Sequence, residues 1–546
     1  MTGLSPDLIL AIVVVGLLAI AASSEVARRT GVATPLILVA AGIAVGFVPG
    51  MPDIEIEPEW ILAGVLPPLV YSASVAMPPM NIRREFGSIT SLSVTLVVLS
   101  TAALGWFFSW VLAVPLAWGL ALGAVVSPTD AVAVAIARRA GVPSRVLTIL
   151  EGEGLLNDAT ALVLLRSAVA AGIASITFGS VVLNFVYAVA VATVIGFVAG
   201  HATLWIRRRI DNPAASTVVS FTVPLVAALP TELAGGSGLV AAVVAGLVIG
   251  QHAPRMLSPR TRLFDRVGWS SVELSLEGLI FLLMGLQLHT LIEDVLGSDG
   301  RIVEAVWVAL AGLALVLVIR AGYVVLLVGS IGRRAGRAAS IQPRLEQINA
   351  AAEERFSNLP DHIGESERMA ERIERIRTRL RRERSKVNYL LRDPTGAKEG
   401  AIIVWAGMRG AVSVAAAQTL PASTPSRSTI VLIAFLLAGG SFLLQGTTLG
   451  ALARRLRPEA SEAHAERERA EHYELLQLLE LTASAEREKD DDRTERAIEL
   501  AVLRAQRDVL LDARDDGTFD GEMLTHALTA VDAQQIALEM QGNPDE

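Results

Sequence analysis

Long apolar stretches recur over roughly the first 450 residues of the chain, and short polar segments separate them. A bilayer core about 30 Å thick is crossed by about 20 mostly apolar helical residues. The pattern therefore predicts an all-α polytopic membrane protein. The eighth and ninth stretches are short and flank Pro230–Ser237, so they could form a re-entrant pair without changing the parity of the crossings. We place thirteen transmembrane helices at residues 5–24, 34–49, 60–77, 89–112, 115–137, 146–172, 179–204, 215–231, 236–250, 268–289, 303–331, 399–420 and 427–451.

Composition agrees with a membrane protein. Hydrophobic residues make up 52% of the chain and charged residues 19%, and the mean hydropathy is +0.51. A soluble protein, which is about 25% charged, could not bury so much apolar surface. The absence of cysteine excludes a disulfide scaffold, a thiolate metal site and cysteine catalysis. From Pro458 onward there are 24 acidic and 9 basic residues, a net charge of −15, whereas the residues before it carry +7. An acidic tail follows a slightly basic apolar body.

Arginines gather in alternate loops. One set of loops holds fourteen of them, whereas the other set holds only Arg301 and Arg427. The positive-inside rule therefore predicts a cell-membrane protein with its N-terminus outside and its C-terminus in the cytoplasm. The first stretch could instead be a cleaved signal peptide, because the small residues Ala21–Ser24 end it, although Met1–Asp7 has no basic side chain. The fourteen are Arg28, Arg29, Arg83, Arg84, Arg138, Arg139, Arg145, Arg207, Arg208, Arg209, Arg255, Arg260, Arg262 and Arg266.

Two polar regions divide the chain. We predict transmembrane helices 1–11 at residues 1–332, a cytoplasmic charged helical insertion at 333–398, helices 12 and 13 at 399–452, and a cytoplasmic acidic helical tail at 453–546. The tail has a turn at Asp515–Gly521 and is typical of a small helical bundle. It holds no candidate site, so we expect a role in regulation or assembly. Apolar residues of the insertion recur at helical or heptad spacing, which favours an amphipathic or coiled helix. They are Met369, Ile373, Ile376, Leu380 and Val387.

A calcium loop starting at Asp512 is excluded, because Arg514 and Met523 occupy positions that need oxygen ligands.

Charges inside the apolar stretches mark the candidate chemistry, because a charge near the bilayer centre costs at least about 2.5–3.5 kcal/mol on insertion scales. The fifth stretch contains Ser127-Pro128-Thr129-Asp130. Proline removes a backbone donor and disfavours helix at the preceding residue, so this helix should break near mid-membrane. The twelfth stretch contains Gly407-Met408-Arg409-Gly410, a second interrupted helix. The two lie an odd number of stretches apart, which predicts an inverted repeat with a midplane ion site.

The sixth stretch holds three carboxylates and an amide within eight residues. On a helix, Glu151, Gly154 and Asp158 share one face, and Gly154 leaves room beside the acid. Glu153 and Asn157 share the neighbouring face. No basic residue lies one turn from Asp158 on this stretch, which favours an ion site over a structural ion pair.

Other positions allow more than one role. Asp130 either caps or pairs the broken helix or coordinates a cation directly. Glu153 is the candidate partner of a buried Arg409, and Glu151, nearer the cytoplasmic end, is expected to be a solvated entrance residue. Three further charged residues, in the tenth and eleventh stretches, are expected to form one or two intramembrane ion pairs whose partners the sequence cannot assign. They are Glu273, Glu277 and Arg320. The possible accessory residues of the site are Glu151, Glu277 and Arg320.

An ordered set of motifs resembles a known family. Over about residues 5–455, the chain resembles the bacterial sodium/proton antiporters of the cation/proton antiporter 1 (NhaP-like) family. The resemblance implies a homodimer, with a rigid dimerisation domain and a mobile core domain in which two broken helices cross at mid-membrane. The motifs are Thr129-Asp130, Glu151-Gly152-Glu153, Asn157-Asp158, Phe281 to Leu288 and Gly407 to Ser413.

The same resemblance assigns roles to residues. It gives the transported-ion carboxylate to Asp158 and the neighbouring amide to Asn157. It places Thr129 and Asp130 in the Na⁺ site, and it assigns a structural ion pair to Glu153 and Arg409. Many relatives carry serine where this chain has Gly154, so one hydroxyl ligand is missing, which bears on the choice among Na⁺, Li⁺ and K⁺.

The physical mechanism leads to the same function. A carboxylate in a low-dielectric cavity can hold a proton or a partly dehydrated cation, but not both well. Competition for one acid, exposed to the two sides in turn, predicts electroneutral exchange of one cation for one proton. The family resemblance implies that the cation is Na⁺ or Li⁺, with K⁺ as a further candidate. We expect a protein that is not an enzyme and needs no cofactor or nucleic acid. A cation channel or another cation-coupled transporter remains an alternative. An intramembrane aspartyl protease would need Tyr-Asp and Gly-x-Gly-Asp motifs, which are absent.

Overall fold

The computed structural model describes residues 6–49, 57–173, 178–298, 300–357, 387, 389, 395–456, 462–489 and 494–541. All elements in these ranges are helices, as predicted. The first part of the membrane body consists of α1 (Pro6–Thr30), α2 (Thr34–Gly46), η1 (Trp60–Val65) leading into α3 (Leu66–Ala76), α4 (Pro79–Thr90) joined through η2 (Ser91–Leu96) to α5 (Val97–Leu112), α6 (Leu116–Val126), α7 (Val132–Arg139) and α8 (Ser144–Ile173).

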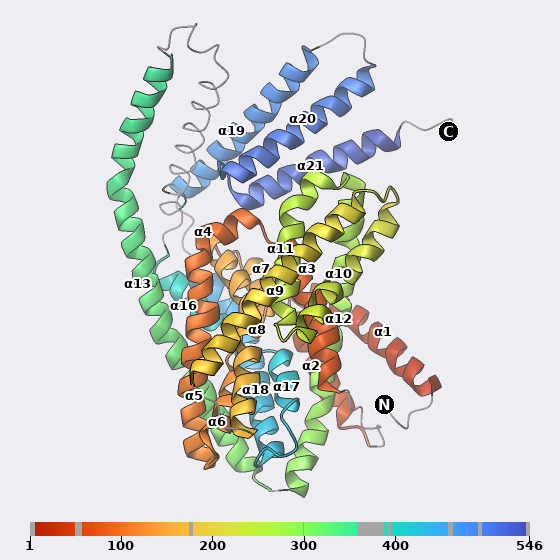
Figure 1. Cartoon of the computed structure of the whole chain (residues 1–546), viewed down its shortest axis with the longest axis vertical. Helices are drawn as coiled ribbons and strands as arrows, with labels where there is room; N and C mark the ends of the chain where they lie inside the picture. Colours follow the sequence, from red (N-terminus) through yellow and green to blue (C-terminus); the bar gives the residue numbers. More distant parts are fainter. Residues whose placement is uncertain are drawn as a thin grey trace.

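The second part of the body and the tail follow. The body continues with α9 (Phe178–Arg207), α10 (Pro213–Leu233), α11 (Gly238–Met256), α12 (Pro259–Gly297), α13 (Ile302–Ser357), α16 (Ala397–Trp405), α17 (Ala411–Gln418) and α18 (Arg427–Leu456). The tail forms α19 (Glu462–Arg487), α20 (Glu495–Asp516) and α21 (Gly521–Met540). Figure 1 shows the body as one elongated bundle, with the three tail helices across the end at which α4 and α11 lie.

The apolar stretches form the expected helices. Among the described residues, eight helices are long and apolar enough to cross a membrane, and three shorter apolar helices accompany them. Helices α10 and α11 have 21 and 19 residues, so both are long enough to cross, which favours two crossings over a re-entrant pair. The total of thirteen crossings stays a prediction.

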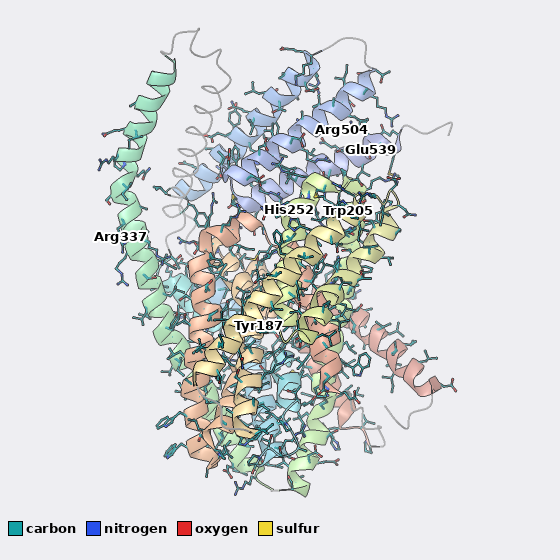
Figure 2. The ribbon with its side chains drawn as sticks, in the orientation of Figure 1. Tyr187, Trp205, His252, Arg337, Arg504 and Glu539 are labelled. Carbon is teal, nitrogen blue, oxygen red and sulfur yellow. The ribbon has the colours of Figure 1, made fainter. Side chains whose placement is uncertain are left out.

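The predicted boundary at residue 332 falls inside a helix. Helix α13 continues through it to Ser357 and is 56 residues long. Its extension, on which Figure 2 labels Arg337, leads away from the body. The heptad pattern from Met369 to Leu380 lies outside the described residues, whereas Val387, from the same set, is helical.

The tail forms the predicted small bundle. Its core contains Leu475 on α19, Leu503 and Leu510 on α20, and Leu524 on α21. Gly517 ends α20 with a φ of 70°, a left-handed conformation that favours glycine, and this residue lies in the predicted turn.

Two helices of the body are interrupted, as predicted. One break separates α6 from α7, and the other separates α16 from α17. The two breaks are in contact, because the Asp130 backbone N–H donates to the Met408 carbonyl at 2.7 Å. In Figure 1, α7 lies above α6 whereas α17 lies below α16, so the broken helices run in opposite directions, as in an inverted repeat. The predicted crossing is confirmed.

Close backbone contact holds neighbouring helices together. A Cβ atom added at Gly42 on α2 would lie 2.4 Å from the carbonyl oxygen of Leu282 on α12. One added at Gly285 would lie 2.4 Å from the carbonyl oxygen of Val39. Helices in a bilayer associate through van der Waals packing, and small residues allow the close approach that this packing needs. At Gly42 and Gly285, helices α2 and α12 therefore cross without room for a side chain between them.

Gly285→Val should destabilise the protein by about 1–3 kcal/mol, because the added side chain overpacks this crossing. The melting temperature in detergent and the monodisperse fraction would measure the effect. Gly322→Val on α13 is the matched control, since a Cβ atom there has nothing within 4 Å. Equal melting temperatures for the two variants would contradict the close crossing.

Candidate cation site

The segment between α6 and α7 carries two of the predicted site residues, Thr129 and Asp130. Oδ1 of Asp130 accepts the Val132 N–H at 2.8 Å, so this carboxylate caps α7. Its second oxygen, Oδ2, faces the other break, where a Cβ atom added at Gly410 would lie 1.4 Å from it. The capping role is therefore present, and direct coordination of a cation by Asp130 stays a prediction.

Helix α8 joins this segment through an amide. Nδ2 of Asn157 donates to Oγ1 of Thr129 at 2.7 Å and to the Thr129 carbonyl at 3.1 Å. Oγ1 of Thr129 donates in turn to Oε1 of Glu153 at 3.2 Å. Both amide hydrogens of Asn157 thus point toward the break, and its buried Oδ1 has no hydrogen-bond partner within the described residues. A buried oxygen left in this way is costly unless a ligand or water meets it.

The ion pair of Glu153 differs from the prediction. Glu153 pairs with Arg320 on α13 through two hydrogen bonds, of 2.5 and 2.9 Å, and both side chains are 2% exposed. The predicted pair with Arg409 is therefore wrong. So is the expectation that Arg320 pairs with Glu273 or Glu277. The reason is geometric, because α13 packs against α16 and the Arg320 guanidinium extends past the Ile403 carbonyl to reach Glu153 on α8.

Arg409 instead ties the two breaks together. Its Nε donates to the Val126 carbonyl at the end of α6, at 3.0 Å, and its guanidinium also donates to the Gly407 carbonyl. Its backbone N–H donates to Oγ of Ser441 on α18 at 3.1 Å. The cation thus satisfies carbonyls that the interrupted helices leave without intrahelical partners.

Asp158 lies in a cavity of about 830 Å³. The side chain is 9% exposed, and no ion pair to it is present in the described part of the chain. Thr129 also lines the cavity, so three of the predicted site residues, Thr129, Asp130 and Asp158, meet in one space. Helices α8 and α12 and the segment between α6 and α7 contribute most of its acidic lining, and the tail contributes one acid. The acidic lining residues are Asp130, Glu151, Asp158, Glu273, Glu277 and Glu522.

The accessory acids have separate surroundings. Glu151 forms an ion pair with Arg138, and its side chain is 24% exposed, which fits the predicted entrance role. Glu273 accepts a hydrogen bond from Oγ of Ser72 at 3.3 Å. Glu277 lines the same cavity as Asp130 and Glu273, so three carboxyl groups of like charge face one space.

Gly154 leaves open space one turn before Asp158. A Cβ atom added there would lie 3.9 Å from the Cβ of Ala131, an ordinary van der Waals distance. Both Gly154 and Ala131 line the cavity, so a serine side chain would have room at this position.

The sequence reasoning missed two features near the site. Glu85 on α4 and Arg145 on α8 form a buried ion pair at 2.7 Å, and both charges stand near the ends of apolar stretches. Three tail residues from the start of α21 also line the cavity, and no local pattern marks them. They are Glu522, Thr525 and His526.

Two crossing broken helices beside an acid-lined cavity define a polytopic secondary transporter. The model of the sodium/hydrogen exchanger transmembrane family matches residues 13–347, so the chain belongs to this family. It is therefore a membrane cation/proton antiporter rather than an enzyme, and it needs no cofactor.

Individual relatives of the chain also carry names of Na⁺/H⁺ exchangers or antiporters. The chain is 27% identical, over 97% of its length and 96% of the relative, to an uncharacterized Na⁺/H⁺ exchanger of Mycobacterium tuberculosis. It is 33% identical to an uncharacterized Na⁺/H⁺ exchanger of Escherichia coli, over 47% of this chain and 49% of that one. The solved sodium/proton antiporter MjNhaP1 of Methanocaldococcus jannaschii has a TM-score of 0.60 at 17% identity, with 84% of this chain and 99% of that chain covered. This structure resembles the chain in fold.

Glu153→Gln and Arg320→Gln should each cost about 3–5 kcal/mol, because each leaves one buried charge without its partner. The double variant should recover part of the loss, and melting temperatures in detergent would measure all three. Glu304→Gln is the control, because its pair with Arg301 is half exposed and is worth only about 0–1 kcal/mol. Wild-type melting temperatures for both single variants would show that the pair does not stabilise the fold.

Proposed function

We propose that the chain exchanges Na⁺ or Li⁺, with K⁺ as a further candidate, for protons in a 1:1 ratio at Asp158. The observation that carries this proposal is the burial of Asp158 in an acid-lined cavity, with no ion pair to it in the described part of the chain. A buried carboxylate needs a counter-charge or a proton, so a cation and a proton compete for it.

The residues around Asp158 support this assignment. The Asn157 oxygen is buried without a partner, and an amide oxygen is a ligand suited to a hard cation. Thr129 and Asp130 line the same cavity and are the further candidate ligands. The Glu153–Arg320 pair neutralises itself, so it adds no net charge beside the site.

Alternating access would complete the exchange. When Asp158 holds a cation or a proton the site is neutral, whereas the empty carboxylate is costly to move through a low-dielectric barrier. The loaded site therefore crosses and the empty one does not, which couples the two fluxes. The two breaks share a hydrogen bond between Asp130 and Met408, and we propose that they move as one unit.

We also propose an orientation and an assembly. The arginine-rich loops support a cytoplasmic location for the end of the body that carries the tail, with the N-terminus outside, in the cell membrane. The homodimer implied by the family resemblance stays a proposal, and the mass of the purified protein in detergent would test it.

Asp158→Asn should reduce exchange below about a tenth of wild type, because the amide keeps the shape of the side chain but neither titrates nor carries a full charge. Proteoliposomes with an imposed pH gradient would report dissipation on addition of Na⁺, Li⁺ or K⁺. Asp211→Asn, at an exposed loop position, is the matched control and should behave as wild type. Sodium-dependent proton movement above that level in the Asp158 variant would refute the assignment.

The exchange rate should not change when a membrane potential is imposed, because swapping one Na⁺ for one H⁺ moves no net charge. A potential of 100 mV is worth about 2.3 kcal/mol per elementary charge, so any uncompensated charge would be visible in the rate. A rate that follows the potential would mean that a second cavity acid, Asp130 or Glu277, carries a proton. A current that reverses at the cation potential would support the alternative of a cation channel.

A further inference from the structure

Arginines of three helices of the body, α4, α11 and α12, hold the tail bundle in place. In Figure 2, Arg504 on α20 and Glu539 on α21 lie above His252 on α11. Arg255 on α11 donates to Asp512 at 2.7 Å and to Asp515 at 2.8 Å. These pairs are exposed, so each is worth little by itself.

Two further contacts between the tail and the body are less exposed to solvent. Arg262 on α12 donates to both carboxylate oxygens of Asp532 on α21, at 2.5 Å each, and the side chains are only 13% and 17% exposed. Such a contact is stronger than an ordinary surface pair. Arg84 on α4 donates to the Gly517 carbonyl at 2.6 Å, just before α21 begins. Since the tail is tethered to the body, docking is intramolecular, and a few such contacts suffice to hold it.

The contacts place the start of α21 at the cation cavity. Oδ1 of Asp520 accepts the Glu522 and Met523 N–H groups and so fixes the first turn. Gly521 lies against Asn81 on α4, where an added Cβ atom would be 2.9 Å from Oδ1 of Asn81. The side chains that follow, Glu522 among them, form part of the wall of the cavity that holds Asp158.

We propose that the first two turns of α21 act as a lid on the cytoplasmic side of the cation cavity. With the tail docked, the lid narrows the path between Asp158 and the cytoplasm and slows exchange. Release of the Arg262–Asp532 contact opens the path. This inference rests on the proposed function for its transport measurement, but not for the accessibility measurement below.

A disulfide would lock the lid. The chain has no cysteine, so Asn81→Cys with Gly521→Cys places the only two thiols. A Cβ atom at Gly521 would lie 3.3 Å from Cγ of Asn81, the position that the sulfur of a cysteine takes, so a bond needs only a small shift. Oxidised protein in proteoliposomes should exchange at least about tenfold more slowly than the same protein after reduction. The two single-cysteine variants should not respond to the oxidant. An equal rate before and after reduction would overturn the lid.

Release of the lid can be measured without transport. Val134 lines the cavity and is only 8% exposed with the tail docked, so Val134→Cys offers a thiol whose labelling by a water-soluble maleimide reports access. Adding Asp532→Asn should speed labelling by about threefold or more, because the docked state loses its best ion pair. Adding Asp508→Asn, at an exposed position on α20, is the control and should leave the rate unchanged.

Equal labelling in all three proteins would overturn the lid even if transport is normal. Conversely, faster labelling in the Asp532 variant, together with no exchange by any protein, would support the lid and refute the proposed function.

Discussion

A bilayer interior offers no hydrogen bonds to the backbone, so an interrupted helix at membrane depth must find partners within the protein. Here the two breaks donate hydrogen bonds to each other, and α13 supplies a further donor. The Val126 carbonyl at the end of α6 accepts from Arg409, and the Ile403 carbonyl near the end of α16 accepts from Arg320. Each broken helix thus has an arginine at the end of its first half. The crossing and the position of the acids beside it depend on this arrangement.

The buried ion pair acts on the cation site through a chain of hydrogen bonds. Arg320 donates to Glu153, which accepts from Thr129, which in turn accepts from Asn157. All hydrogen bonds of this series donate toward Glu153 or Thr129, so the NH₂ group of Asn157 donates to Thr129. The amide oxygen is left without a hydrogen-bond partner in the described part of the chain. The buried ion pair, which lies beside the cavity acids, therefore fixes the orientation of the Asn157 amide.

The sequence predicted the helices and both breaks because the signals are local. The length of an apolar stretch is visible in the chain, and so are Pro128 and the glycines around Arg409. The partner of Glu153 was not predictable in the same way. Two arginines stand at membrane depth, and the one that reaches Glu153 is Arg320, which lies 167 positions away on α13.

The contact of the tail with the cavity was still less visible. Glu522 lies hundreds of positions from Asp158, and an acidic residue at the start of a helix is ordinary at a surface. The net charge of the tail showed that the tail is acidic, but not which part of the body it contacts. In the structure, Arg255 near the end of α11 and Arg262 in the first turn of α12 pair with aspartates of the tail.

Gly154 has an evolutionary consequence. The open space beside it accepts a hydroxymethyl group without repacking, since the nearest atom is 3.9 Å from the position of a Cβ. Glycine and serine codons can differ by a single nucleotide. A lineage could therefore gain or lose a potential cation ligand in one step, while the packing around the site stays intact. A change of ligand at this position would then be independent of folding stability.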